Sequence, residues 1–220
     1  MRSESASIPP SHFSTLAPYF STPTASSMPY SHLNDYPADI RERAARVRLA
    51  CFDVDGTLTD GRLYFDGEGS ELKAFHVHDG QGLTLLRKAG IEVAFITARG
   101  GPIAKRRGTD LGIDEVHVGV KDKLACVQDI AARLGITMEQ VSFMGDDLAD
   151  LRVMLQTGFA VAPSDAHRWV GERVHWRTTA RAGHGAAREF CDLLLAAQGH
   201  AERLLEDLLR VEGVRVEGNA

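Results

Sequence analysis

The sequence predicts an α/β fold in which one parallel sheet carries helices on both of its faces. Short apolar runs recur along the chain, and helix-like stretches that often close on a glycine separate them. Runs that are apolar on both faces are typical of parallel strands buried between two helical layers. We therefore expect a Rossmann-like three-layer domain whose ligands bind beyond the carboxyl ends of the strands.

The elements follow one another in a regular order. A short amphipathic helix over 38–47 leads into a buried strand over 48–54. Further strands are expected at 92–98, 115–120, 141–145, 158–162 and 173–176. Helices are expected at 82–90, 102–112, 122–135, 147–158 and, at the C-terminal end, 201–211.

One segment interrupts this alternation. Residues 62–79 hold two strand-like runs on either side of Asp66-Gly67-Glu68-Gly69, a pattern that predicts a β-hairpin with a glycine turn. The hairpin comes soon after the first strand, so we expect it to project near the edge where that strand ends. Between the first strand and Gly80 there is room only for this hairpin, and no cap domain is expected.

Composition limits the classes of function. The chain has 220 residues, of which 44% are hydrophobic and 25% charged, and its formal net charge is −5. These values are typical of one globular domain and argue against a dedicated nucleic-acid binder. No apolar run is long enough to span a membrane. Cys51, Cys126 and Cys191 are too far apart in the sequence for a CxxC zinc ribbon, and free thiols are typical of a cytoplasmic protein.

The chain divides into three parts by composition. Residues 1–37 are rich in serine and proline without hydrophobic periodicity, which predicts a disordered extension. This extension has neither the basic start nor the apolar stretch of a signal peptide. The catalytic domain is expected over 38–198, and a C-terminal helix and tail over 199–220.

Polar side chains of a particular kind stand where the expected strands end. They are Asp53 and Asp55 after the first strand, Thr97 at the second, Lys123 after the third, and Asp146, Asp147 and Asp150 after the fourth. Parallel strands place their carboxyl ends at one sheet edge, so these groups are expected to converge. Carboxylates without histidine or cysteine are hard oxygen ligands that suit Mg²⁺. A threonine hydroxyl and a lysine ammonium suit phosphate oxygens.

This set of groups predicts phosphoryl transfer. A carboxylate such as Asp53 can attack phosphorus and form an acyl phosphate, and Asp55 can act as the acid and then the base. A calcium loop also begins with spaced aspartates, but Thr57 and Tyr64 stand where it needs a ligand and a glutamate. Each residue alone is compatible with a cap or a solvated side chain. Their joint order at successive strand ends favours the functional interpretation.

The same residues resemble a known family. Asp53-x-Asp55-Gly56-Thr57, Thr97, Lys123 and Gly145-Asp146-Asp147-x-x-Asp150 resemble the four motifs of the haloacid dehalogenase superfamily of phosphohydrolases. Longer segments resemble its cap-less, tetrameric subfamily that acts on 3-deoxy-D-manno-octulosonate 8-phosphate, from about residue 38 to 198. These segments are 51–83, 96–99, 119–124, 144–154, 161–167 and 183–195.

The resemblance implies roles for individual residues. Asp53 is expected to be the nucleophile and Asp55 the acid/base, with Thr97 and Lys123 holding the phosphate. Mg²⁺ is expected on Asp53, the Asp55 backbone carbonyl and Asp146, with Asp147 and Asp150 behind them. Substrate contacts are expected from His76, His78, Asp79, Gly80, Arg99, Arg107 and Lys123.

The resemblance also implies an assembly. Family members form homotetramers in which the hairpins pack into a central barrel and a neighbouring subunit covers each active site. The glycine-rich segment around Gly183-His184-Gly185 is expected to help close that site. A small phosphorylated acidic sugar is the expected partner, with no nucleic acid, no membrane and a cytoplasmic location.

Four positions depart from the family pattern, and two rival functions stay open. His78, Thr84, Ala98 and His184 occupy positions where many relatives carry other residues, and all four concern substrate recognition or closure. One rival is a phosphatase for a nine-carbon acidic sugar 9-phosphate, which His78 keeps open. The other is a non-catalytic oligomerisation module, which the intact set of aspartates, Thr97 and Lys123 disfavours.

Overall fold

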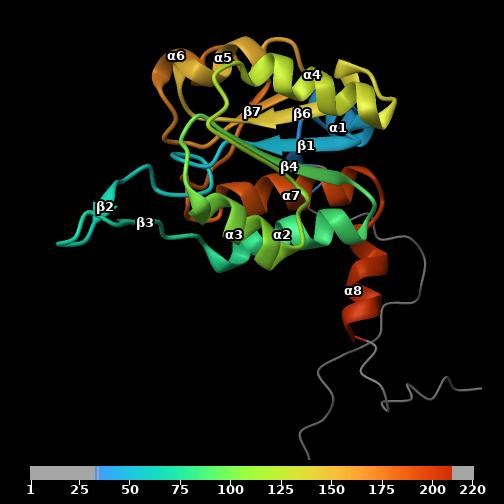
Figure 1. Ribbon diagram of the computed structural model, residues 1–220. Helices are drawn as coiled ribbons and strands as arrows, with labels where there is room; N and C mark the ends of the chain where they lie inside the picture. The colour runs from blue at the N-terminus through green and yellow to red at the C-terminus, as the bar shows by residue number, and fades with distance from the viewer. Residues whose placement is uncertain (1–32, 34, 210–220) are drawn as a thin grey trace, which may run out of the picture.

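The computed structural model describes residue 33 and residues 35–209, and one six-stranded sheet organises them (Figure 1). The strands of this sheet are β1 (Leu49–Phe52), β4 (Glu92–Thr97), β5 (Glu115–Val118), β6 (Val141–Met144), β7 (Phe159–Ala162) and β8 (Trp176–Arg177). Their order is β5-β4-β1-β6-β7-β8, and every neighbouring pair is parallel. The expected parallel sheet is confirmed, and the last strand lies slightly later than the predicted 173–176.

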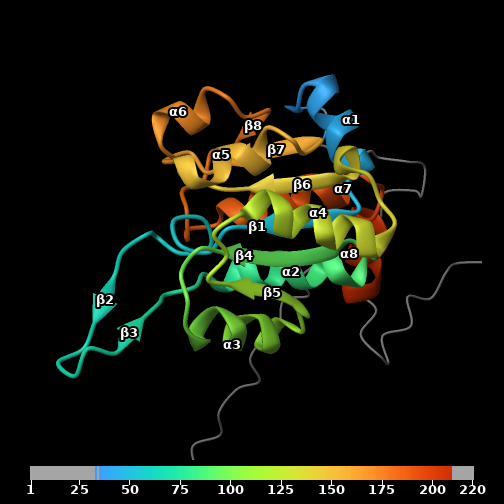
Figure 2. The ribbon, with the colours of Figure 1, turned by 45° about the horizontal axis from the view of Figure 1, so that its top comes forward.

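Helices cover both faces of the sheet (Figures 1 and 2). The described helices are α1 (Ala38–Arg46), α2 (Val77–Lys88), α3 (Pro102–Leu111), α4 (Lys123–Leu134), α5 (Leu148–Met154), α6 (Arg168–Gly171), α7 (Ala186–Ala197) and α8 (Ala201–Leu209). A 3-10 turn covers Met138–Gln140. Helices α2, α3 and α7 lie on one side, and α4, α5 and α6 lie on the other. The expected three-layer α/β class is therefore confirmed.

The two sides of the sheet carry separate cores. Along β1, Ala50 and Phe52 belong to the core shared with α2 and α7, whereas Leu49 and Cys51 belong to the core shared with α4 and α5. Phe190 of α7 packs within 5.7 Å of Phe52, measured between ring centroids. Because both faces of β1 are buried, the strand reads as a continuous apolar run.

The start of α2 differs from the prediction. The second strand-like run of the hairpin was expected to extend to residue 79, and the helix to begin at 82. In the structure the strand β3 (Glu71–Leu72) is short, and α2 begins at Val77. Gly80 and Gly82 lie inside the helix and are buried, Gly80 against Arg107 of α3 and Gly82 against Cys191 of α7. Close packing of α2 against these neighbouring helices overrides the poor helix propensity of glycine.

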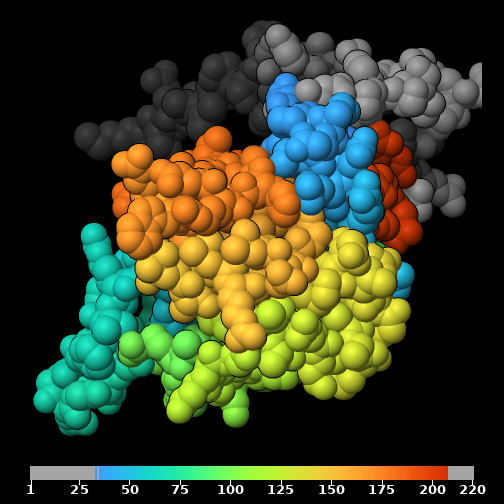
Figure 3. Space-filling model, turned by 90° about the horizontal axis from the view of Figure 1, so that it is seen from above, coloured from blue at the N-terminus to red at the C-terminus, as the bar shows by residue number. Residues whose placement is uncertain are grey.

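The hairpin stands out from the body of the molecule (Figures 1 to 3). The strand β2 (Tyr64–Phe65) pairs with β3 in antiparallel register, and the segment between β1 and α2 contains no other strand or helix. Leu63, Phe65 and Leu72 are 50%, 60% and 57% exposed. The hairpin therefore exposes apolar side chains that pack little against the core of the domain.

Both ends of the chain extend beyond the described part. The expected C-terminal helix is present as α8, although its predicted last two residues lie outside the described range. Almost all of the Ser/Pro-rich segment 1–37 also lies outside it, so the prediction of disorder stays a prediction. Within the described residues, no helix is both long enough and apolar enough to cross a membrane.

Candidate active site

Asp53 lies at the centre of a buried group of charges. It directly follows β1, and its backbone N donates to the Met144 carbonyl of β6 over 2.9 Å, which fixes the end of the strand. Lys123 Nζ lies 2.7 Å from Asp53 Oδ1 and 2.5 Å from Asp150 Oδ1. The side chains of Lys123 and Asp150 are only 4% and 1% exposed. The sequence expectation that these strand-end groups converge is thus met by the geometry.

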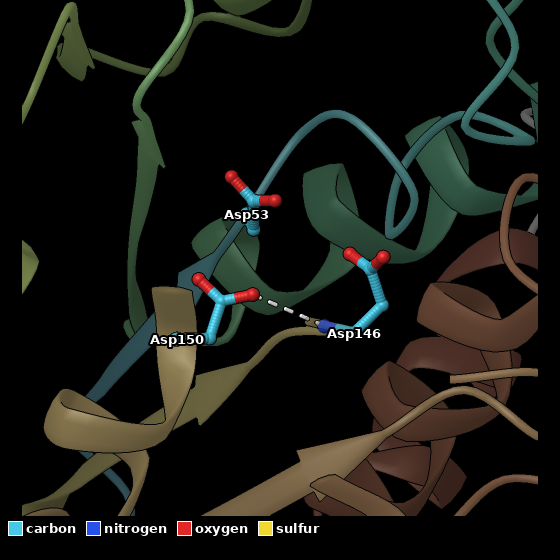
Figure 4. A group of neighbouring side chains, drawn as sticks. All are labelled: Asp53, Asp146 and Asp150. Atoms are coloured by element: carbon cyan, nitrogen blue, oxygen red, sulfur yellow. Dashed lines mark hydrogen bonds between the residues drawn. The ribbon is translucent and has the colours of Figure 1, made fainter. Parts of the chain in front are cut away.

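Lys123 and Asp150 occupy these positions because of local helix signals. Asp122 caps α4 by accepting from the Ala125 amide, so Lys123 becomes the first helical residue after β5. Asp147 caps α5 in a capping box with Asp150, whose Oδ2 accepts from the backbone amides of Asp146 and Asp147 at 3.1 and 3.3 Å. Asp150 therefore holds the turn that carries Asp146, as Figure 4 shows.

Three carboxylates in this group meet the basic requirement of a metal site. Oxygens of Asp53, Asp146 and Asp150 lie within 4.8 Å of one another (Figure 4). Both oxygens of Asp150 already accept hydrogen bonds, so Asp53 and Asp146 offer the available ligand atoms. Thr57 Oγ1 donates to Asp146 Oδ1 over 2.9 Å and orients it. A Cβ at Gly56 would overlap the Asp146 carboxylate, so only glycine fits beside it.

The electrostatics of these carboxylates also fit a divalent cation. Burial raises the pKa of Asp146 to about 7, and the nearby charges of Asp53 and Asp150 add to the shift. Burial and the charge of Asp150 raise the pKa of Asp53 as well, although Lys123 opposes them. Negative charges gathered away from water call for a cation between them, and an all-oxygen donor set suits Mg²⁺.

Asp55 faces a different set of partners from Asp53. Thr97, buried at the end of β4, donates from Oγ1 to Asp55 Oδ2 over 3.1 Å, and its hydroxyl accepts from the Arg99 amide. Asp55 Oδ1 contacts Lys73 Nζ and lies 3.9 Å from Arg99 Nε. Asp53 is therefore held by Lys123 of α4, whereas Asp55 is held both by Thr97 of β4 and by Lys73 of the hairpin.

Sequence reasoning missed two residues of this site. Lys73, which follows β3, contacts Asp55, and its Nζ lies 2.9 Å from Glu71 Oε1. Glu71 Oε1 in turn lies 3.0 Å from an Arg99 guanidinium nitrogen. Neither residue has a spacing signal in the sequence. The only available indication was the expected closeness of the hairpin to the Asp pair.

Five of the seven residues expected to contact substrate form a second group around the start of α2, whereas Arg99 lies beside Asp55 and Lys123 beside Asp53. Arg107 of α3 lies over the Phe75 ring, with its guanidinium carbon 5.4 Å from the ring centroid, and donates to the His76 carbonyl. The His76 and His78 rings lie 5.0 Å apart, edge to face. A small pocket is lined by Leu58, Phe75, His76, Asp79, Gly80, Leu83, Phe95 and Arg107.

Asp79 of this group is engaged inside the protein. Its carboxylate is buried and accepts from the amides of Arg188 and Gly185, at the N-terminus of α7. Burial raises the pKa of Asp79, against these two hydrogen bonds. Asp79 therefore joins the start of α2 to the start of α7. Its expected contact with substrate remains a prediction.

The glycine-rich segment connects the two groups. The Gly183 amide donates to the Thr57 carbonyl, and a Cβ at Gly183 would lie 2.6 Å from the Asp60 amide nitrogen. Gly185 contacts Asp79, and His184 Nδ1 lies 2.8 Å from the Ala182 carbonyl. This segment thus packs on the loop that follows Asp55 and also on the expected substrate side.

Comparison with known proteins gives consistent results. Residues 112–190 match the family of haloacid dehalogenase-like hydrolases. The 3-deoxy-D-manno-octulosonate 8-phosphate phosphatase of Yersinia pestis is 43% identical over 164 residues, which cover 74% of this chain and 88% of that protein. A hypothetical protein from Xanthomonas campestris has a solved structure with 57% identity and a TM-score of 0.80, covering 83% of this chain and all of that one.

A further relative has been solved with ligands bound. The 3-deoxy-D-manno-octulosonate 8-phosphate phosphatase of Moraxella catarrhalis, in complex with magnesium, phosphate and KDO, is 35% identical with a TM-score of 0.76. The match covers 79% of this chain and 99% of that one. The chain therefore belongs to the haloacid dehalogenase-like hydrolases and, within them, to the family of 3-deoxy-D-manno-octulosonate 8-phosphate phosphatases. The sequence-based recognition of both levels is confirmed.

Proposed function

We propose that this protein is a Mg²⁺-dependent phosphatase that converts 3-deoxy-D-manno-octulosonate 8-phosphate into the free sugar acid and phosphate. The observation that carries this proposal is the buried contact of Lys123 with Asp53 and Asp150 beside Asp146. This arrangement supplies a nucleophile, a phosphate-binding cation and metal ligands at one sheet edge. The family to which the chain belongs supports the choice of substrate.

The proposed reaction has two steps. In the first, an oxygen of Asp53 bonds to phosphorus while the bond to the sugar oxygen breaks and Asp55 gives its proton to that oxygen. In the second, a water oxygen bonds to phosphorus while the bond between phosphorus and Asp53 breaks, and the water passes a proton to Asp55. Phosphate leaves, and the Asp53 carboxylate is restored. Asp53, the Asp55 carbonyl and Asp146 would hold Mg²⁺, which screens the negative charge of the phosphate. Lys123 would hold the phosphate oxygens. The one hydroxyl proton of Thr97 is donated to Asp55 in the structure, so the expected contact of Thr97 with phosphate stays a prediction.

The other end of the substrate carries a carboxylate and hydroxyls. Arg99 is the more exposed cation beside Asp55, at 40% of its side chain, and Arg107 stands at the second group. We infer that these arginines and the His76–His78 pair receive the sugar acid, with Gly80 and Asp79 shaping the backbone there. Planar guanidinium groups suit carboxylates because they can donate two hydrogen bonds at once.

The proposal is tested by phosphate release in the presence of Mg²⁺. The eight-carbon sugar acid 8-phosphate, a nine-carbon sugar acid 9-phosphate and glucose 6-phosphate are compared by their kcat/KM values. A clear preference for the eight-carbon ester supports the proposal. A preference for the nine-carbon ester would instead identify the rival substrate. His78 keeps this rival open, because a histidine side chain donates hydrogen bonds differently from the arginine that many relatives carry there. Absence of turnover on every ester would overturn the phosphatase function and favour the non-catalytic module.

We also infer a homotetramer with a cytoplasmic location. The exposed apolar side chains of the hairpin, Leu63, Phe65 and Leu72, support self-association through this element. Association there would bring a neighbouring subunit next to the active site, since Lys73 of the same hairpin contacts Asp55. Free cysteines at 51, 126 and 191 fit a reducing compartment. Molar mass in solution, measured by light scattering, tests the assembly.

A further inference from the structure

We propose that Lys73 is a positioning residue for Asp55 that holds its carboxylate in the orientation needed for proton transfer to the leaving group. This inference rests on the proposed function and extends it to a residue outside the motifs. Lys73 belongs to the hairpin, one residue beyond β3, whereas the nucleophile and its partners belong to the sheet and its helices.

The contacts of Asp55 define a single orientation of its carboxylate. Lys73 Nζ contacts Oδ1, and Thr97 Oγ1 donates to Oδ2 over 3.1 Å. The two donors come from different elements, the hairpin and the end of β4. Rotation of the carboxylate would break at least one of these contacts, so together they fix the orientation of the Asp55 carboxylate.

Lys73 is itself held in place by a ring of alternating charges. We call Asp55, Lys73, Glu71 and Arg99 the charge ring. Glu71 Oε1 lies 2.9 Å from Lys73 Nζ and 3.0 Å from an Arg99 nitrogen, and Arg99 Nε lies 3.9 Å from Asp55 Oδ1. The two positive and two negative charges balance. Removing Lys73 alone would leave the carboxylates of Asp55 and Glu71 without the cation that lies between them.

Burial distinguishes the two cations of the charge ring. The Lys73 side chain is 5% exposed, and its ammonium already has two carboxylate partners. The Arg99 side chain is 40% exposed, so it is the cation of the ring that can meet a ligand. Lys73 therefore acts through Asp55 rather than through substrate. Moving a buried lysine away from two carboxylate partners costs considerable free energy. Lys73 is therefore held firmly, as a positioning residue must be.

Two simple esters separate this role from a general structural one. Phenyl phosphate and 4-nitrophenyl phosphate have nearly the same shape, but only the poorer leaving group, phenolate, needs a proton as it departs. We expect Lys73→Met to lower kcat/KM for phenyl phosphate by at least about tenfold more than for 4-nitrophenyl phosphate, because general acid catalysis is what it impairs. Lys105→Met, at an exposed lysine of α3, is the control and should change neither value.

A double-mutant cycle completes the test. In an Asp55→Asn background, Lys73→Met should produce no further loss with phenyl phosphate, since its effect passes through the missing carboxylate. Equal losses of kcat/KM on both esters, or a full additional loss in the Asp55→Asn background, would overturn the positioning role of Lys73. The proposed function would still stand as long as the wild-type protein released phosphate. If the wild-type protein released no phosphate from any ester, both would fail. If Lys73→Met does not fold, the same measurements are made on Lys73→Arg. This variant keeps the positive charge but moves the hydrogen-bond donor.

Discussion

The two aspartates of the first motif are held by different parts of the molecule. Asp53 pairs with Lys123, which begins a helix packed on the sheet, and the pair is almost fully buried. Asp55 pairs with Lys73 from a hairpin whose Leu63 and Phe65 remain largely exposed. In the proposed mechanism, bond formation at phosphorus therefore depends on groups held by the sheet and its helices. The proposed proton transfer depends in addition on the hairpin, whose apolar side chains are largely exposed, so it should respond to whatever stabilises the hairpin.

The largest effect should come from the body. Asp53→Asn removes the proposed nucleophile and is expected to lower phosphatase kcat by at least about a thousandfold, as loss of a nucleophile does in other covalent mechanisms. Steady-state phosphate release measures it. Asp110→Asn, at an exposed aspartate paired with Arg106 on α3, is the matched control and should keep full activity. Unchanged turnover in Asp53→Asn would contradict the assignment of the nucleophile.

The hairpin can be tested with two leucines of equal exposure. Leu72 of β3 and Leu155 at the end of α5 are both 57% exposed. Leu72→Asp should reduce the molar mass in light scattering and lower activity with it, because a charge in an apolar contact between subunits carries a large desolvation cost. Leu155→Asp should leave both unchanged. An unaltered mass for Leu72→Asp would argue against assembly through the hairpin.

The glycine-rich segment offers a smaller perturbation. Gly183 and Gly199 both have positive φ, +62° and +72°, but only at Gly183 would a Cβ meet backbone atoms of residues 59 and 60. Alanine at either position costs roughly 1–2 kcal/mol through its left-handed backbone. Gly183→Ala should additionally push the segment off the Asp55 loop and lower kcat/KM, whereas Gly199→Ala should affect only the melting temperature. Equal kinetics for the two variants would disconnect the segment from the site.

The smallest effect concerns pH and metal. The pKa of Asp146 is raised to about 7 from an ordinary value of 3.8, so the folded protein binds this proton more tightly than the unfolded chain. That contribution to stability is complete at low pH and is lost as pH rises towards 7. We therefore compare the melting temperatures of metal-free protein at roughly pH 5 and roughly pH 8. The decrease between these two conditions should be smaller in Asp146→Asn than in the wild-type protein.

Mg²⁺ gives the complementary measurement. A metal competes with protons for the same carboxylates, so added Mg²⁺ should raise the melting temperature of the wild-type protein more at the higher pH. In Asp146→Asn the Mg²⁺ effect should be small at both. A Mg²⁺ stabilisation that did not depend on Asp146 would place the metal elsewhere.

The sequence predicted the parts of this molecule that follow from local pattern. The buried runs located β1 and β4, and the order of Asp53, Thr97, Lys123 and Asp146 at strand ends located the site. Helix α7 was not assigned, and α2 was expected to begin five residues too late, at 82 rather than Val77. The α2 error concerns a helix that contains Gly80 and Gly82, which pack against α3 and α7 respectively.

Lys73 and Glu71 could not be found in the same way. The positions of strand-end residues follow from sheet topology, which periodicity reveals. The position of a hairpin side chain depends on how the hairpin bends back over the sheet edge, and no residue spacing encodes that bend. Asp79 was expected on the substrate side for its place in a motif, yet its hydrogen bonds run to α7. Such long-range contacts require the tertiary structure.

The contact between Gly56 and Asp146 limits how this site can diverge. The loop carrying the two motif aspartates and the turn after β6 touch so closely that a methyl group at residue 56 would occupy the place of the Asp146 carboxylate. Residue 56 is therefore constrained twice, by the Asp146 carboxylate and by its own backbone, whose φ of +93° favours glycine. A sequence that lost the carboxylate at 146 would gain space at residue 56, but the left-handed backbone there would still disfavour a side chain, so only one of the two constraints on Gly56 would be relaxed.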